Sequence, residues 1–311
     1  MKILQPGVLA LLQDAGRIGQ HRIGLTVGGP MDPFAFRWAN RLCHNQYNDS
    51  AIEISIGGFS TEFTESTQIA ITGAKVDAKL NGNAVPMWET LNIAAGDVLK
   101  LGFATEGCRI YLAVLGGIQL EAQFGSTATV VREGLGGLST KSGKPLAKED
   151  QLTLSTLPLK TRLKMPEADR PDYTDTTPLN VVLGYQTNSF SDLDKARFFN
   201  GEYTVSERMD RMGYRLTGPI CKSSVTSMLS EGICHGAIQM PPDGQPIVLL
   251  NDRQTIGGYP KLGSVMARDT ARLAQMTQGK TLTFYAVTTE EAHAINVLAR
   301  RREANIELLS L

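Results

Sequence analysis

Three stretches of the sequence place acidic, basic and amide side chains beside glycines. They comprise residues 14–32, 206–215 and 251–261. A carboxylate beside an arginine can orient water or an amide N–H, and a guanidinium can hold a carboxylate through two parallel hydrogen bonds. Glycines let the backbone approach a ligand and direct N–H groups toward an anion. The three stretches therefore indicate recognition of a planar amide or a carboxylate.

Each stretch also has a simpler interpretation. Asp14 and Arg17 in the first stretch can pair merely to brace a loop, and the sequence favours neither interpretation there. The charges of the second and third stretches can be ordinary solvated loop charge. That alternative is weaker for the third stretch, because the apolar run 247–250 leads directly into it and would hold its side chains rigidly.

Standard catalytic signatures are mostly absent. The pairs Gly143-Lys144 and Gly279-Lys280 lack the earlier glycine of a phosphate-binding P-loop, so the chain is not expected to hydrolyse ATP alone. The sequence has neither a metal-spaced histidine cluster nor a G-x-S-x-G turn, and no metal is expected. Cys43-His44 and Cys234-His235 are adjacent pairs. Neighbours on a strand point to opposite faces, which favours a structural role for both pairs.

Composition narrows the choice of partners. The 311 residues include 31 Lys plus Arg and 31 Asp plus Glu, with no long block of one sign, so a nucleic-acid or membrane surface has no electrostatic basis. A small molecule or a protein partner fits better. The four cysteines are scattered, which indicates reduced thiols. No run reaches the roughly 18 apolar residues of a membrane span, so a cytoplasmic protein is expected.

The elements that would position these side chains are mainly strands. From about residue 52 to 155, short apolar runs with partial period-two alternation are separated by turn residues, which is typical of an antiparallel meander. The predicted strands include 69–71, 75–80, 98–101 and 109–114. Hairpin turns are predicted at 81–83 and 95–97.

Helices are few. Asp32 followed by proline predicts a helix of about three turns that ends before Asn45. Ser191 opens a short helix that stops at residues 200–201, and another helix precedes Gly279. A terminal helix opens at residues 288–289 and carries apolar residues as far as Ile306.

Two domains are predicted. Four prolines among charged residues between 155 and 180 indicate a linker there. An internal repeat supports the division, because residues 11–14, followed by two Ile-Gly pairs, are echoed by 249–252 with similar spacing. This echo favours a duplicated barrel with permuted connections, although chance similarity between glycine-rich strand ends is the alternative.

Long motifs in order along the chain resemble the biotin-dependent carboxyltransferase family, which includes the C subunit of bacterial 5-oxoprolinase and was formerly labelled allophanate hydrolase subunit 2. The motifs that carry this resemblance are LQDAGR at 12–17, GGPMD at 28–32, RWAN at 37–40, DRMGYR at 210–215, SEG at 230–232, GAIQMP at 236–241, DRQT at 252–255 and GGYP at 257–260.

The resemblance implies a mainly β fold of two cyclophilin-like β-barrel domains, pseudo-duplicated. With the linker, this predicts domains at 1–165 and 176–311, and the first strand, up to about Asp14, either packs in its own half or crosses to the other. It also implies partner subunits A and B, with ATP used by the complex and no cofactor bound by this chain alone. The sequence departs from the family pattern at several positions. Thr26 replaces a frequent proline, Asn251 an alanine and Ile256 a threonine, and GSTAT at 125–129 replaces a motif of the type Gly-Ser-Arg-Ser-Thr.

On this resemblance, the chain would support ATP-dependent opening of the 5-oxoproline lactam to glutamate. Arg17, Arg211 and Arg253 would hold a carboxylate or a phosphorylated carbonyl oxygen. Asp14, Asp210 and Asp252 would orient water or the amide N–H. The further residues expected to contact substrate are Gly28, Gly29, Met31, Asn40, Gln239, Gln254, Tyr259 and Lys261.

Two other functions remain open at this point. The same side chains could serve carboxyl transfer to a urea-like amide, with biotin carried by a partner protein because this chain has no biotinylation sequence. Alternatively, the chain could be a regulatory protein that sequesters a subunit-B-like kinase inhibitor. Regulation should survive mutation of the Asp and Arg clusters, whereas catalysis should not.

Overall fold

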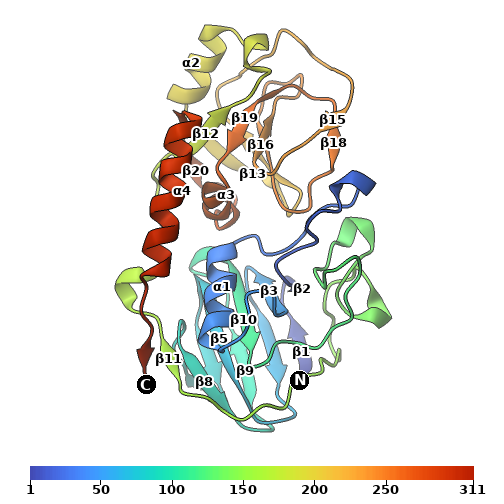
Figure 1. Cartoon of the computed structure of the whole chain (residues 1–311), viewed down its shortest axis with the longest axis vertical. Coiled ribbons are helices and arrows are strands. Elements are labelled where there is room, and N and C mark those ends of the chain that lie inside the picture. Colours follow the sequence, from blue (N-terminus) through green and yellow to red (C-terminus); the bar gives the residue numbers. More distant parts are fainter. The chain divides into compact units, whose positions relative to one another are not determined.

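The computed structural model describes residues 1–311, and the chain divides into two compact units. Unit 1 consists of Met1–Gln20, Val27–Thr174 and Ile306–Leu311, and unit 2 consists of His21–Thr26 and Asp175–Asn305 (Figure 1). A short piece of the N-terminal half therefore belongs to unit 2, and the last six residues belong to unit 1. The expected division into domains at 1–165 and 176–311 stays a prediction.

The protein is mainly β, as predicted, with four α-helices. The helices are α1 (Pro33–Leu42), α2 (Asp192–Asn200), α3 (Ala267–Ala274) and α4 (Thr289–Ala304). None of these helices combines the length and the apolar character that crossing a membrane requires. The strands of unit 1 are β1 (Lys2–Pro6), β2 (Leu9–Gln13), β3 (Ala51–Ser55), β4 (Phe59–Glu62), β5 (Thr67–Lys75), β6 (Ala78–Leu80), β7 (Asn83–Ala84), β8 (Thr90–Ile93), β9 (Val98–Leu101), β10 (Glu106–Val114), β11 (Leu163–Lys164) and β22 (Leu309–Ser310). The strands of unit 2 are β12 (Leu179–Leu183), β13 (Tyr203–Met209), β14 (Gly213–Thr217), β15 (Glu231–Gly232), β16 (Ala237–Gln239), β17 (Ile247–Leu249), β18 (Ile256–Gly257), β19 (Lys261–Val265), β20 (Thr281–Leu282) and β21 (Phe284–Val287).

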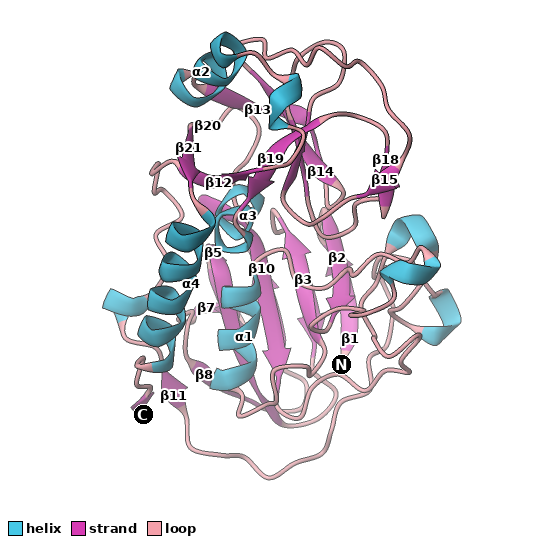
Figure 2. Cartoon of the chain, turned by 45° about the horizontal axis from the view of Figure 1, so that its top comes forward, coloured by secondary structure: helices cyan, strands magenta, loops and turns pink.

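Unit 1 is built from two antiparallel five-stranded sheets, ordered β1-β4-β9-β6-β7 and β2-β3-β10-β5-β8. Apolar side chains of both sheets form one core, which includes Ile3 and Leu99 from the first sheet and Ile54 and Leu112 from the second. The other face of the second sheet is covered by α1, whose Trp38 packs with residues of β5 and β10 (Figure 2). Strand β3 is buried along its whole length because both of its faces are covered.

The first helix begins where the sequence predicts. Asp32 caps α1 by accepting a hydrogen bond from the Ala35 amide at 3.1 Å, and Pro33 occupies the first helical position, where no N–H is needed. Two further helices, α2 after Ser191 and α4 after Thr288, also begin at their predicted caps. These caps place the helix starts reliably because each one satisfies an otherwise unpaired amide.

Unit 2 contains an eight-stranded sheet in the order β20-β13-β14-β17-β16-β19-β12-β21. Its edge strands β20 and β21 are consecutive in sequence and are separated by Thr283 alone, so the sheet curls into a nearly closed barrel. Phe198 of α2 stacks on Phe284 of β21 with ring centroids 4.6 Å apart. A separate two-stranded ribbon, β15–β18, pairs Glu231 with Gly257.

Several details of the sequence prediction are wrong. The strands of unit 1 are antiparallel but do not form a meander, because most neighbours in each sheet are not consecutive in sequence. The predicted strand 75–80 is interrupted, since β5 ends at Lys75 and β6 begins at Ala78. The turn at 95–97 does not close a hairpin, because β8 pairs with β5 in one sheet while β9 pairs with β4 and β6 in the other. The turn at 81–83 does join two paired strands, β6 and β7. Helix α4 ends at Ala304 with Asn305 as its C-cap, so Ile306 lies beyond it and joins the core of unit 1.

Candidate functional site

Arg211 and Asp252 form a buried ion pair in unit 2. The Arg211 Nε and Nη2 atoms donate to the two carboxylate oxygens of Asp252, each at 2.9 Å, and the Asp252 amide donates to the Arg211 carbonyl at 2.8 Å. The structure thus brings together two of the predicted site residues. Because both carboxylate oxygens accept from Arg211, the pair fixes the 251–254 loop onto the β13–β14 turn, and Asp252 is poorly placed to act as a base.

Asp210 has a different role from its neighbour. It is exposed, and its Oδ1 accepts hydrogen bonds from the amides of Met212 at 2.7 Å and Gly213 at 3.1 Å. An aspartate that accepts from amides two and three residues onward stabilises a tight turn. The predicted catalytic residue Asp210 therefore shapes the β13–β14 hairpin.

Arg253 is a buried cation with spare hydrogen-bonding capacity. Its Nε donates to the Ile233 carbonyl at 3.3 Å and its Nη1 to the Leu250 carbonyl at 3.2 Å, while Nη2 makes no hydrogen bond within the protein. The residue is 4% exposed, and this burial lowers the pKa of its guanidinium. The Arg253 guanidinium is therefore available to an anionic group of a ligand.

The segment that joins unit 2 from the N-terminal half holds this loop. Thr26 is fully buried, and its hydroxyl lies 3.0 Å from the carbonyl of Asn251 and 2.9 Å from that of Arg253, to which it donates. One hydroxyl proton is shared between the two carbonyls. Sequence reasoning noticed Thr26 only as a departure from a family pattern and did not give it a role.

His235 and Cys234 lie next to Arg253. The His235 Nε2 is 2.7 Å from the Thr270 hydroxyl, and burial followed by the Arg253 charge lowers the pKa of His235 to about 4. The imidazole is therefore neutral at pH 7. Cys234 is the one exposed cysteine, and its Sγ lies 3.0 Å from the Ser264 hydroxyl.

Glu231, on strand β15 of the two-stranded ribbon, forms hydrogen bonds with three polar side chains. It bonds to the Lys261 Nζ, to the Gln186 Nε2 and to the Tyr185 hydroxyl. Gln186 also accepts from the Lys261 amide at 2.7 Å. The Lys261 ammonium, followed by Tyr185, holds the pKa of Glu231 below its ordinary value. Glu231 was quoted within a motif but not predicted as a site residue, because its partners come from distant parts of the chain.

The remaining predicted residues of unit 2 surround this group. Gln239 of β16 pairs across the sheet with Lys261 and is almost fully buried. Gln254 is half-buried and Tyr259 is 41% exposed, and the side chain of neither makes a hydrogen bond. Unit 2 therefore pairs Arg211 with Asp252 and Gln239 with Lys261, and Arg253 follows Asp252 in the same loop.

The first glycine-rich stretch forms a braced loop in unit 1. The Asp14 carboxylate accepts from the Gly16 amide at 2.9 Å, from the Ser126 hydroxyl at 2.6 Å and from the Thr127 amide at 2.7 Å. Arg17 donates to the carbonyls of residues 123, 126 and 128. Both side chains thus bind the 123–128 segment, which matches the bracing interpretation that the sequence left open.

Close packing explains the glycines of this stretch. Gly28 and Gly29 both have positive φ, and a Cβ on Gly28 would lie 2.8 Å from Val130, while one on Gly29 would lie 3.0 Å from the Ala15 carbonyl oxygen. Asn40 on α1 is buried, and its amide donates to the Asp49 carbonyl at 2.9 Å. Gly28, Gly29 and Asn40, which the sequence analysis expected to contact substrate, therefore have structural roles in unit 1.

A buried acidic group of unit 1 escaped sequence reasoning. Glu53 of β3 accepts from the Met31 amide at 2.8 Å and from the Tyr111 hydroxyl at 2.7 Å, and Tyr111 accepts from the Asp32 amide at 2.8 Å. Burial, followed by the charges of Glu53 and Asp32, raises the pKa of Tyr111 well above its ordinary value. The network anchors the start of α1. Only the isolated acid in the apolar run AIEIS hinted at it.

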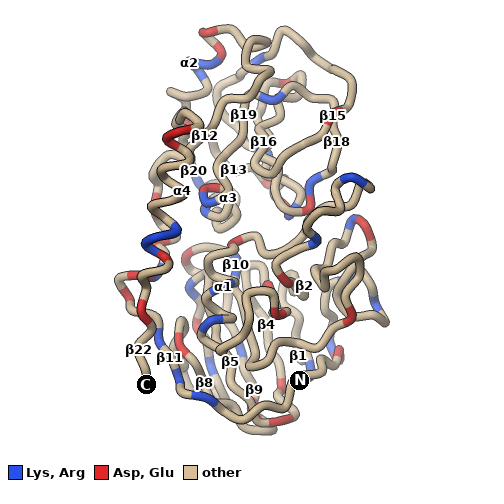
Figure 3. Tube along the Cα trace, in the orientation of Figure 1, with Lys and Arg blue, Asp and Glu red and all other residues tan.

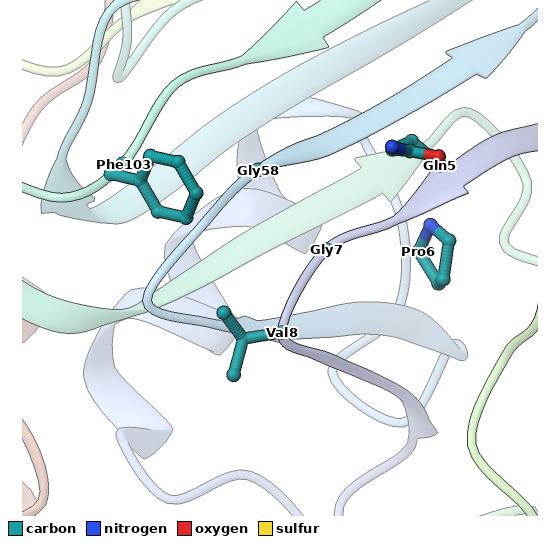
Figure 4. Close-up of a pocket in the computed structure, with 6 residues that line it drawn as sticks. All are labelled: Gln5, Pro6, Gly7, Val8, Gly58 and Phe103. Carbon is teal, nitrogen blue, oxygen red and sulfur yellow. The ribbon is translucent and has the colours of Figure 1, made fainter.

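A surface pocket of about 380 Å³ lies elsewhere in unit 1, beside the backbone of Gly7 and Gly58. Figure 4 shows the rings of Phe103 and Pro6 and the side chain of Val8 around that backbone. None of the predicted site residues lines it. Lys and Arg are interspersed with Asp and Glu along the chain in each unit (Figure 3).

Comparisons with known proteins agree on one family. Residues 23–286 match the model of the carboxyltransferase domain, subdomain A and B. The chain is 35% identical to the 5-oxoprolinase C subunit of Escherichia coli (strain K12) over 94% of its own length and 93% of that relative. It is also 33% identical to a putative urea carboxylase of Emericella nidulans, over 93% of this chain and 24% of that protein. The crystal structure of the K. lactis urea amidolyase superposes with a TM-score of 0.89 at 28% identity, covering 98% of this chain and 20% of that one.

Proposed function

Because this chain belongs to the carboxyltransferase domain family, we propose that it is the C subunit of an ATP-dependent 5-oxoprolinase complex, which opens 5-oxo-L-proline to L-glutamate together with subunits A and B. The observation that carries this proposal is Arg253, a buried guanidinium whose Nη2 has no protein partner. The similarity to 5-oxoprolinase C subunits over nearly the full length of both chains supports it.

Arg253 suits the carboxylate of 5-oxoproline better than the other two predicted arginines. Arg211 donates to both oxygens of Asp252, and Arg17 donates to three backbone carbonyls. A charge-assisted hydrogen bond from the free Nη2 would therefore anchor the substrate by its carboxylate. Lys261, which Glu231 holds in place, would supply a second positive charge near the same sheet.

Subunits A and B would supply the chemistry that this chain lacks. A lactam carbonyl is a weak electrophile, and phosphoryl transfer from ATP to its oxygen on a partner would make the carbonyl carbon easier to attack. Water would then add to this carbon, the ring C–N bond would break with the nitrogen leaving as the amine, and a second water would hydrolyse the resulting acyl phosphate to glutamate and phosphate. This chain would hold the substrate carboxylate and exclude bulk water while the partner acts. Its contribution would thus be binding and orientation rather than ATP hydrolysis.

The test is 5-oxoproline-dependent ATP hydrolysis and glutamate release with all three subunits, each omitted in turn. Arg253→Ala should raise the KM for 5-oxoproline about 30-fold, since a charge-assisted hydrogen bond contributes about 2 kcal/mol. Arg253→Lys should recover part of this loss. Arg300→Ala, which removes an exposed arginine of α4, is the matched control and should leave KM unchanged. An unchanged KM in a folded Arg253→Ala complex would refute the assignment.

A second candidate function is carboxyl transfer to urea. The similarity to the urea carboxylase of Emericella nidulans and the superposition on the K. lactis urea amidolyase favour it. In that case biotin would arrive on a partner protein, and the same arginine would hold a carboxylate. A biotinylated partner that co-purifies with this chain, combined with no 5-oxoproline turnover, would favour this function over the first.

A further inference from the structure

Gln239 has a buried amide that the protein leaves unused. The residue is 2% exposed, and its Nε2 is a buried donor without a hydrogen-bond partner. Its Oε1 accepts no hydrogen bond from the protein either, so both halves of the amide are unengaged. Buried polar side chains are nearly always hydrogen-bonded, because desolvating an unpaired donor is costly. Other buried atoms, such as the Thr67 hydroxyl, also lack a partner, so the case for a ligand rests on this unused amide together with the charged side chains beside it.

The surroundings of the amide are built around a glycine. A Cβ on Gly257 would lie 2.9 Å from the Gln239 Nε2 and 2.5 Å from the Ile233 Cδ1, so the Gly257 backbone lies directly against the amide. Gly257 belongs to the β15–β18 ribbon, where it pairs with Glu231. The ribbon flanks the amide, and each of its strands contains only two residues.

The charged neighbours do not compete for the amide. Glu231 is engaged by Lys261 and Gln186, and Lys261 is the cross-strand partner of Gln239. Glu231, Lys261 and Gln186 thus bond to one another, whereas the Gln239 amide beside them makes no hydrogen bond. This amide offers one N–H donor and one carbonyl acceptor side by side.

We propose that the Gln239 carboxamide binds the cis-amide edge of the substrate, and this inference rests on the proposed function. A lactam and a urea both present an N–H and a C=O on the same edge, whereas an ordinary peptide-like amide places them on opposite edges. The Gln239 Nε2 donates to the ligand carbonyl, and its Oε1 accepts from the ligand N–H. Gly257 of the β15–β18 ribbon lies against the Gln239 Nε2, so a ligand that bonds to this atom would contact the ribbon.

Gln239→Leu and Gln239→Glu test this pairing. Leucine removes both halves of the amide at similar size, and glutamate removes the donor. Each variant should raise the KM for 5-oxoproline at least tenfold in the complex with subunits A and B, with a smaller change in kcat. The Tm of Gln239→Leu should not fall, since replacing an unpaired buried amide by an apolar side chain is neutral or stabilising. Its far-UV circular dichroism spectrum should match that of the wild type.

Thr67→Val is the matched control. The Thr67 hydroxyl is likewise buried without a partner, but it lies on β5 in unit 1. Its replacement should have the same effect on Tm and none on KM. Direct binding of 5-oxo-L-proline, urea and the trans-amide N-methylacetamide to the full chain, measured by calorimetry, provides the second readout. The first two should bind, and Gln239→Leu should abolish their binding.

The outcomes separate this inference from the proposed function. An active wild-type complex whose Gln239 variants keep their KM would mean that the amide holds only a buried water, and the inference would fail while the function stands. A wild-type complex without 5-oxoproline turnover would refute the function, and urea binding would then decide the inference alone. Urea binding that disappears in Gln239→Leu would support it, and binding that is absent or unchanged would overturn it.

Discussion

At the scale of single residues, three arginines of similar sequence context have three different environments. Arg17 binds backbone carbonyls of a loop, Arg211 binds a carboxylate, and Arg253 keeps one amino group without a protein partner. The residue type alone predicts the capacity to bind an anion, and the folded environment decides whether that capacity remains. Mutation of each arginine should therefore produce a different phenotype.

His235 is expected to make the stability of unit 2 depend on pH. Its folded pKa of about 4 lies below the unfolded value of 6.5, so the unfolded chain binds more protons between these values. The stabilising contribution is complete above pH 6.5 and decreases as pH falls through this window. Lowering the pH from 7 to 4.5 should cost about 2 to 3 kcal/mol through this residue.

Denaturant unfolding at a series of pH values measures this contribution. His235→Gln can keep a hydrogen bond to Thr270 but does not titrate, so its free energy of unfolding should decline less between pH 7 and 4.5 than that of the wild type. His293→Gln, on the exposed side of α4, should follow the wild-type curve. Parallel curves for wild type and His235→Gln would show that His235 is accessible to protons in the folded state.

At the scale of elements, a six-residue segment positions the loop that carries Arg253. Residues 21–26 join unit 2 although they are encoded within the first tenth of the chain, and Thr26 provides the hydrogen bonds to residues 251 and 253. A loop held by side-chain bonds from a distant segment is ordered without being part of a sheet. Its order should depend on that hydroxyl together with the Arg211–Asp252 ion pair.

Thr26→Val should loosen the 251–253 loop. Valine keeps the shape of threonine but leaves two carbonyls without their donor, at a cost of about 1 to 3 kcal/mol. Amide hydrogen exchange of residues 250–254 should therefore accelerate, and the KM for 5-oxoproline should rise. Thr26→Ser, which retains the hydroxyl, should resemble the wild type. Equal exchange in all three proteins would contradict the positioning role.

The sequence predicts elements better where the determinants are local. Helix starts could be predicted at Asp32, Ser191 and Thr288 because each of these side chains accepts a hydrogen bond from the amide three residues later. Both partners of such a bond are visible in a short stretch of sequence. The turn at 95–97 was misassigned because sheet membership depends on partners far along the chain. The grouping around Glu231 was missed for the same reason, since its partners are 30 to 46 residues away.

At the scale of the whole molecule, the chain passes between its two units four times, at residues 20/21, 26/27, 174/175 and 305/306. Two domains that are each continuous in sequence and joined by one linker would require a single passage of the chain from one to the other. The additional passages arise because a segment near each end of the chain belongs to the other half. Each unit therefore depends on residues that simple truncation at the proline-rich linker would remove.

Deleting residues 306–311 should destabilise unit 1. Ile306 belongs to the same buried cluster as Trp38, and β22 pairs with β11. Loss of one buried isoleucine and of a strand pair should cost about 3 kcal/mol or more and lower the Tm by several degrees. Thermal unfolding followed by tryptophan fluorescence measures this directly, because both tryptophans, Trp38 and Trp88, lie in that cluster. Deleting only Leu311, which is exposed, is the control.

The final six residues have a consequence for synthesis on the ribosome. Most of unit 1 precedes unit 2 along the chain, yet strand β22 of unit 1 is synthesised only after every segment of unit 2 has been made. Strand β11 therefore has no β22 to pair with until more than a hundred later residues have been synthesised. A nascent chain that stops early therefore cannot complete its first unit, so premature termination yields a product that quality-control proteases can distinguish from the finished protein.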